Sequence, residues 1–348
     1  MNGMRVSFDH RRLPDVGSVP EFLGAIRRLR TQSEITTATW FRGASKACYQ
    51  PLPTIGCPHS YADIGNRDLD WVDERNILHR FRRRAYQHSG RLLDSWEALF
   101  LARHYFLPAR ILDWTAHPLA ALWFACSTDP HENAALWCIA RTETEEFDLD
   151  VVELARRPGA ESEGFGPLEI YTQYTIDDGA IGQVRDMLGD VAWLGELEKL
   201  KGFYDRGCEF FQKATKILGR LFSDHRAVLL KCARDQSSKN PSEHDAVKIL
   251  HPFYNSPRIT AQGGAFTFHS NPWIELTKYA KHPFLVERLD IKGLFEWNVP
   301  AGKKAGILRE LELYHGMKRE VLFPDLDGLS KGLLESILLA PKRAGLVP

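Results

Sequence analysis

The chain has 348 residues, of which 44% are hydrophobic and 26% charged, and its 45 basic residues balance 45 acidic ones. This composition is typical of a folded globular protein and excludes collagen-like, low-complexity and intrinsically disordered classes. Zero net charge also argues against a general electrostatic attraction to nucleic acid or anionic membranes, while a local basic patch stays compatible with it. The length accommodates one large domain or two small ones with a sizeable core.

The cysteines and the N-terminal residues predict a cytoplasmic protein. The six cysteines include no C-x-x-C pair, which favours reduced thiols over a disulfide framework. Residues 1–12 are polar and charged and lack the apolar core of a secretory signal. The longest apolar stretch, residues 118–126, is too short to span a bilayer. We therefore expect no membrane partner, and the sequence leaves oligomerisation open.

In chain order, helical periodicity predicts helices over 18–30, 69–87, 95–105 and 118–127, the third of them capped by Ser95. Asp113 and His117 are assigned to the loop before the fourth helix. Apolar and β-branched runs predict strands, and a further pair of helices closes the chain. Since helical and strand patterns are mixed without regular alternation, we expect an α+β fold, a mixed sheet with surrounding helices and a helical insertion. The expected strands are 35–41, 135–140, 246–250, 264–268 and 284–291, and the expected closing helices are 303–314 and 325–339.

The same pattern divides the chain into parts. After Arg141 the sequence becomes acidic and loop-like, and over 175–234 it is amphipathic and mostly helical, which indicates an insertion or lid. The expected parts are an N-terminal helical extension (1–34), a first core part (35–142), the mainly helical insertion or lid (143–243), a second core part (244–300) and C-terminal helices packed on the core (301–348).

Arg42 is the first candidate site residue, because it ends an apolar strand and precedes Gly43. A buried arginine is costly unless an anion or a carboxylate meets its donors. The glycine would let a backbone or a ligand approach closely. Arg42 is therefore either an anion-binding residue or a structural arginine paired with an internal Asp or Glu.

A second cluster lies between residues 96 and 118. Glu97 and His104 are seven residues apart, so that on one helix they share a face. The alternative is structural: Arg110 and Asp113 pair with each other or with Glu97, and with Arg42 they form a buried ion-pair network. The hydrophobic core around that network would consist of Trp40, Phe41, Trp96, Leu112, Trp114 and Phe124.

A third cluster combines Arg258 and Gln262 with Gly263 and Gly264. Fixed side-chain donors beside exposed backbone N–H groups suit a phosphate or an amide-bearing ligand, whereas the glycines alone are equally typical of a bulge or tight turn. No Cys/His spacing typical of a metal site is present, so we predict no metal. Walker A, G-x-G-x-x-G and G-x-S-x-G motifs are also missing from the sequence.

Together these residues resemble the FRG domain family, which is named for its Phe-Arg-Gly motif and carries the signature Q-H-Y-G-L-P-T-R-L-L-D-W-T. Here Phe41-Arg42-Gly43 is followed by H-Y-F-L-P-A-R-I-L-D-W-T over 104–115. Residues 258–266 resemble a later R-x-x-x-Q-x-G-x-F element and 322–328 the C-terminal end, so that the resemblance spans about 40–330. This chain departs from the signature with Arg103 for Gln, Phe106 for Gly and Ala109 for Thr.

FRG domains recur in bacterial and phage-related proteins and are largely uncharacterised, so the resemblance implies a family more than an activity. From the residue roles we expect an enzyme acting on a nucleotide, most concretely an NAD-consuming, ADP-ribosyltransferase-like toxin or defence enzyme with an unknown macromolecular acceptor. NAD would be its substrate. The expected catalytic residues are Arg42, His104, Glu97 and Gln262, and the expected cofactor-binding residues are Tyr105, Trp114, Arg258 and Gly263.

Two other functions stay open. One is a non-catalytic effector that binds nucleic acid or protein through a basic face made of residues 79–84 with Arg27, Arg28 and Arg30. The other is a metal-dependent nuclease that uses His104, Asp113 and His117.

Overall fold

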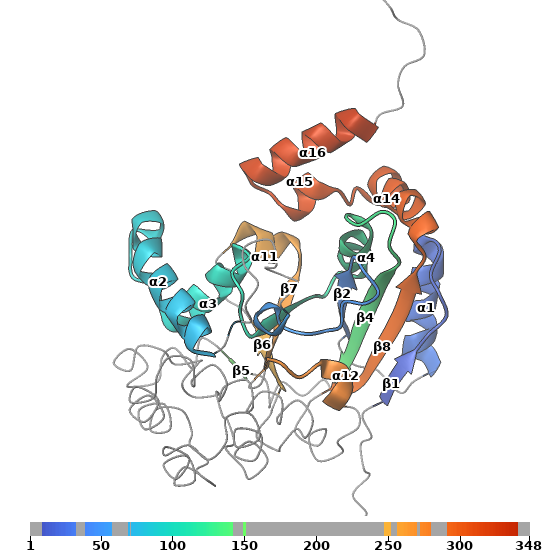
Figure 1. Cartoon of the computed structure of the whole chain (residues 1–348). Helices are drawn as coiled ribbons and strands as arrows, with labels where there is room; N and C mark the ends of the chain where they lie inside the picture. Colours follow the sequence, from blue (N-terminus) through green and yellow to red (C-terminus); the bar gives the residue numbers. More distant parts are fainter. Residues whose placement is uncertain are drawn as a thin grey trace, which may run out of the picture.

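The computed structural model describes residues 9–32, 39–57, 69, 71–141, 149–150, 247–251, 256–269, 272–279 and 291–339. Their strands form one eight-stranded mixed sheet in the order β1-β8-β4-β2-β3-β7-β6-β5, with helices around it, which confirms the expected α+β fold (Figure 1). The outermost pairs, β1–β8 and β5–β6, are parallel and the inner pairs are antiparallel. The strands are β1 (Asp9–Arg12), β2 (Thr39–Ala44), β3 (Ile111–Thr115), β4 (Ala134–Arg141), β5 (Leu149–Asp150), β6 (Val247–His251), β7 (Gly264–His269) and β8 (Ile291–Val299).

The described helices flank this sheet (Figure 1). They are α1 (Val19–Gln32), α2 (Trp71–Ser89), α3 (Ser95–His104), α4 (Pro118–Cys126), α11 (Pro257–Ala261), α12 (Leu276–Tyr279), α14 (Ala301–His315), α15 (Arg319–Leu322) and α16 (Leu326–Leu339), with a short 3-10 turn at Thr54–Gly56.

One face of the sheet carries two separate hydrophobic clusters. In the α4 cluster, α1, α4 and α14 pack on β2, β4 and β8 around Phe22, Phe41 and Trp297. In the α3 cluster, α2 and α3 pack on β3 and β7 around Phe100 and Phe268. Antiparallel partners point to the same side of a sheet, and the pairs Phe41–Thr115 and Ile111–Phe268 therefore place both clusters on one face. Figure 1 shows α2 and α3 at one end of the sheet and α1 and α14 at the other.

The opposite face carries a third cluster, built on Trp40, Leu112, Trp114 and Trp137 and covered by the segment that leads into α12. The core residues named in the structural alternative are thus buried, except Phe124, which is partly buried. They belong to three clusters on two faces and not to one core.

The structure corrects several local expectations. Asp113 lies within strand β3 and not in a loop, because residues 111–115 pair in register with β7. Strand β8 covers Ile291–Val299, whereas the expected strand was 284–291, of which 284–290 lie outside the described residues. Helix α3 is capped by Asp94 and not by Ser95. The insertion expected over 143–243 lies outside the described residues apart from β5.

The four cysteines among the described residues, Cys48, Cys57, Cys126 and Cys138, are free thiols. None of the helices in the described ranges is both long enough and apolar enough to cross a membrane.

Candidate functional site

A cleft opens on the helix-covered face, between the α4 cluster and the α3 cluster. Its inner cavity has a volume of about 260 Å³ and lies where β2 and β3 diverge after their single registered pair, Phe41–Thr115. An outer cavity of about 370 Å³ adjoins it on the side of α15 and α16. Because the two cavities share lining residues, they form one cleft of the size of a small-molecule site. The shared residues are Arg42, Gly43, Phe106, Phe124, Arg258 and Phe323.

Arg42 lies in the gap between the diverging strands. Its Nη1 donates to the backbone carbonyl of Asp113 at 2.8 Å and lies 3.8 Å from the Asp113 carboxylate. Among the described residues nothing accepts a hydrogen bond from its Nε or Nη2. Burial lowers the pKa of Arg42, yet a guanidinium stays charged in proteins. Arg42 therefore has spare, charged donors at the junction of the two cavities.

The Asp113 carboxylate is shared by two arginines. Arg103, at the end of α3, donates from Nε to Asp113 Oδ2 at 2.9 Å and also from Nη2, which is the forked geometry of a strong guanidinium–carboxylate pair. Since Arg42 and Arg103 face one carboxylate, this side of the inner cavity carries surplus positive charge. That surplus favours an anionic ligand.

His104 also lines the inner cavity, on the wall that Ser256 and Arg258 form. Ser256 Oγ is 3.2 Å from its Nδ1, and the same oxygen accepts from the backbone N–H of Arg258, as the cap of α11. Burial first, and then the positive charge of Arg258, lower the pKa of His104. The ring is therefore neutral at pH 7, in the form that accepts a proton.

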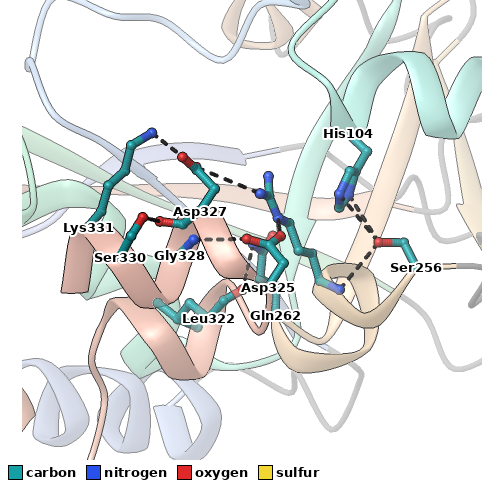
Figure 2. Close-up of polar contacts among 10 residues, drawn as sticks. His104, Ser256, Gln262, Leu322, Asp325, Asp327, Gly328, Ser330 and Lys331 are labelled. Atoms are coloured by element: carbon teal, nitrogen blue, oxygen red, sulfur yellow. Dashed lines mark hydrogen bonds and ion pairs between the residues drawn. The ribbon is translucent and has the colours of Figure 1, made fainter. Parts of the chain in front are cut away.

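Arg258 and Gln262 connect this wall to the C-terminal helices, as the network in Figure 2 shows from His104 to Lys331. Arg258 pairs with Asp325 through Nε, and its guanidinium stacks over Phe323 at 5.1 Å. Gln262 donates to the carbonyl of Leu322 at 3.0 Å. The hydrogen bond from Arg258 lowers the pKa of Asp325. These contacts hold the segment from Leu322 to Asp325 at the cleft, where Phe323 lines both cavities.

Three of the residues expected in the site do not present their side chains to the cleft. Glu97 lines neither cavity: its carboxylate accepts from the backbone of Asp94 in a capping box and pairs with Arg91 at the far end of α3. Tyr105 is 60% exposed and also lines neither cavity. Trp114 borders the inner cavity, but its indole is buried in the opposite-face cluster and donates to Thr267 Oγ1 at 3.0 Å.

Packing explains two of the three glycines singled out in the sequence, Gly43 and Gly263. A Cβ on Gly43 would lie 1.9 Å from the carbonyl oxygen of Ala121, so helix α4 approaches this backbone too closely for any side chain. Gly263 has φ +55°, and a Cβ there would lie 2.6 Å from the ring of His117. The Gly263 carbonyl accepts from Ala116, which ties the turn after α11 to the end of β3.

The ion pairs differ from the network proposed as the structural alternative. Arg110 pairs with Glu74 of α2, fully buried, and not with Asp113 or Glu97. The described residues contain no group of three His, Cys, Asp or Glu side chains arranged to hold a metal ion, so the geometry gives the nuclease alternative no support. The two basic segments also fail to form one face, since α1 and α2 lie at opposite ends of the sheet (Figure 1).

Several of these residues lie in a segment that matches a known protein family. The model of the FRG domain family matches residues 37–134, which include Arg42, Gly43, Arg103, His104 and Asp113. The chain carries an FRG domain. No curated protein and no solved structure matches the chain.

The FRG domain supplies one side of the cleft. The other side, Arg258, Gln262 and Phe323, lies beyond the matched residues, where the resemblance seen in the sequence stays a prediction. Sequence reasoning overlooked two lining residues of the FRG domain, Arg103 and Phe106, although both had stood out as departures from the family signature. It also missed Phe323, for which the resemblance of residues 322–328 to the C-terminal end of the family gave the signal.

Proposed function

We propose that this FRG-domain protein is an enzyme that acts on a nucleotide, in its most concrete form an NAD-consuming, ADP-ribosyltransferase-like toxin or defence enzyme. The observation that carries the proposal is the pairing of Arg42 and Arg103 with the single carboxylate of Asp113 inside an aromatic-walled cleft. Guanidinium groups bind phosphate oxygens in a fork, and aromatic walls accept flat rings. A nucleotide presents both kinds of group.

The residues that line the inner cavity suit the chemistry of ADP-ribosyl transfer. In that reaction the bond from ribose to nicotinamide breaks, nicotinamide leaves with the bonding electron pair, and a nucleophile of the acceptor bonds to the ribose carbon. Neutral His104 would take the proton that the acceptor loses. Arg42 would hold the diphosphate through its spare donors, and the amide of Gln262 would orient a ribose or an amide group.

The test is binding of NAD to the purified protein by calorimetry, followed by an assay for nicotinamide release. Replacing Arg42 by Ala should weaken binding about ten- to a hundredfold, the value of charged hydrogen bonds to an anion. The matched control is Arg91→Ala, which removes an arginine that lines neither cavity and should leave binding unchanged. If the wild-type protein binds no NAD, the proposal is wrong. Binding that survives Arg42→Ala would remove Arg42 from the site.

A non-catalytic nucleic-acid-binding role keeps one specific observation, the exposed arginines Arg80, Arg83 and Arg84 on α2. Binding of single-stranded or duplex DNA that weakens steeply with salt, and that is lost when these three become Gln, would favour that role.

A further inference from the structure

Phe106 is an exposed aromatic residue in a backbone conformation that suits glycine. Its φ is +62°, in the left-handed region, and 72% of the residue is exposed. Phe106 follows the last turn of α3: its own N–H donates to the carbonyl of Arg103, and the N–H of Leu107 donates to that of Ala102. These two bonds define a helix end in which glycine is the usual residue at this position.

Phe106 therefore destabilises the folded state in two ways. A side chain in the left-handed region is strained by contact of its Cβ with the neighbouring carbonyl. A phenyl ring left in water also forgoes the gain that burial would give. The FRG signature has glycine at this place, in keeping with the backbone conformation, so this chain carries an avoidable strain that the fold itself does not require. Strain of this kind concentrates where function requires it.

The position of the Phe106 ring indicates what this strain could serve. Phe106 lines both the inner and the outer cavity, as do Arg42 and Arg258. The ring lines the same two cavities as the guanidinium of Arg42, and most of the residue is exposed to solvent. An aromatic face next to an anion-binding group is the combination that holds a base or a nicotinamide ring beside its phosphate.

We propose that Phe106 is a ligand-contact residue, whose ring stacks on the planar ring of the nucleotide in the cleft and closes over it. This inference rests on the proposed nucleotide function. It assigns the strain at the end of α3 to binding, and it gives this chain a ring contact that a glycine in the family signature does not provide.

The test is a substitution that should raise the stability of the protein and weaken its binding of NAD. Phe106→Gly should raise Tm, by about 2 °C, because the strain is relieved, and should weaken NAD binding about five- to a hundredfold, because stacking is lost. Phe106→Ala should lose the same affinity without the gain in Tm. Phe106→Trp should bind NAD at least as tightly as the wild type.

The matched control is at the end of α14. Gly316 has φ +62°, and a Cβ there would meet nothing within 4 Å. Gly316→Phe should therefore lower Tm by about as much as Phe106→Gly raises it, and should leave NAD binding unchanged. A Phe106→Gly protein that is no more stable than the wild type would overturn the strain argument.

The binding data separate the two proposals. NAD affinity that depends on Arg42 but is unchanged by Phe106→Gly and Phe106→Ala would overturn the role of Phe106 and leave the nucleotide function standing. If the wild-type protein binds no NAD, both proposals fail together.

Discussion

Glu74 of α2 and Arg110 at the start of β3 form an ion pair that is almost completely excluded from water. Their side chains are 2% and 1% exposed, and Glu74 accepts from the backbone N–H, Nε and Nη2 of Arg110 at 2.8, 3.0 and 2.7 Å. The pair fastens α2 to the strand that carries Asp113. It therefore supports one wall of the cleft without lining it.

We expect Arg110→Met to lower the free energy of unfolding by about 3–5 kcal/mol, since it leaves the Glu74 carboxylate buried without its partner. Urea unfolding measures this change. The control is Arg91→Met, which breaks the solvent-exposed pair with Glu97 and should cost less than about 1 kcal/mol. The double variant Glu74→Leu with Arg110→Met should recover most of the loss, and a double variant as unstable as Arg110→Met alone would contradict this explanation.

Lys304 of α14 is a second buried charge, 1% exposed, and burial lowers its pKa. Its ammonium group donates to backbone carbonyls of the segments that follow β2 and α4. These belong to Ser45, Thr128, Asp129 and Glu132, at 2.7–3.3 Å.

Lys304→Met should cost about 2–4 kcal/mol of unfolding free energy, because four partly buried carbonyls lose their donor at once. Its neighbour Lys303 is exposed, and Lys303→Met should change stability by less than about 0.5 kcal/mol. Equal effects of the two substitutions in chemical denaturation would show that the carbonyl contacts do not stabilise the fold.

Gly43 gives a prediction for the Phe-Arg-Gly motif itself. Gly43→Ala should destabilise the fold by at least about 3 kcal/mol, since the new methyl group would collide with the backbone of α4 at Ala121 and Ala125. Gly306, exposed in α14 with open space around it, provides the matched control. Gly306→Ala should stabilise the protein by about 0.5–1 kcal/mol. A Gly43→Ala protein with wild-type Tm would contradict the packing explanation and favour a role of Gly43 in ligand binding.

The sequence predicted what depends on local periodicity and little of what depends on distant partners. Most helices and strands were placed to within a few residues, and Arg42, His104, Arg258 and Gln262 do line one cavity. Glu97 was misjudged because seven-residue spacing puts it on the same face as His104, whereas the capping box and Arg91 hold its carboxylate at the other end of α3.

The ion pairs that hold the walls of the cleft join residues that are distant in sequence. Arg110 meets Glu74 and Arg258 meets Asp325, pairings that only the folded chain reveals. Trp114 was misjudged for a related reason: the alternation of β3 turns its ring to the face opposite Asp113, and the segment had been assigned to a loop. The left-handed backbone at Phe106 could not be predicted from phenylalanine itself, and its one signal was the glycine that the family signature carries at this position.

The charges around His104 give a prediction for pH. Burial and Arg258 lower its pKa, while the carboxylates of Asp325 and Asp113 oppose that change. NMR titration of the ring should therefore give a pKa below about 6.5, the ordinary value for histidine. Because the unfolded chain binds this proton more readily, His104 should make the folded state lose stability as pH falls from about 6.5 through the folded pKa.

Asp325→Asn should lower the pKa of His104 further, because it removes an opposing carboxylate while the asparagine still accepts from the N–H of Gly328. Glu21→Gln on α1 removes one negative charge at the other side of the molecule and should leave the His104 titration unchanged. The His104 signal is assigned from its loss in His104→Gln. A pKa that is unchanged in Asp325→Asn would show that the charge of Asp325 does not act on His104, and that the C-terminal segment is electrostatically separate from the His104 wall of the cleft.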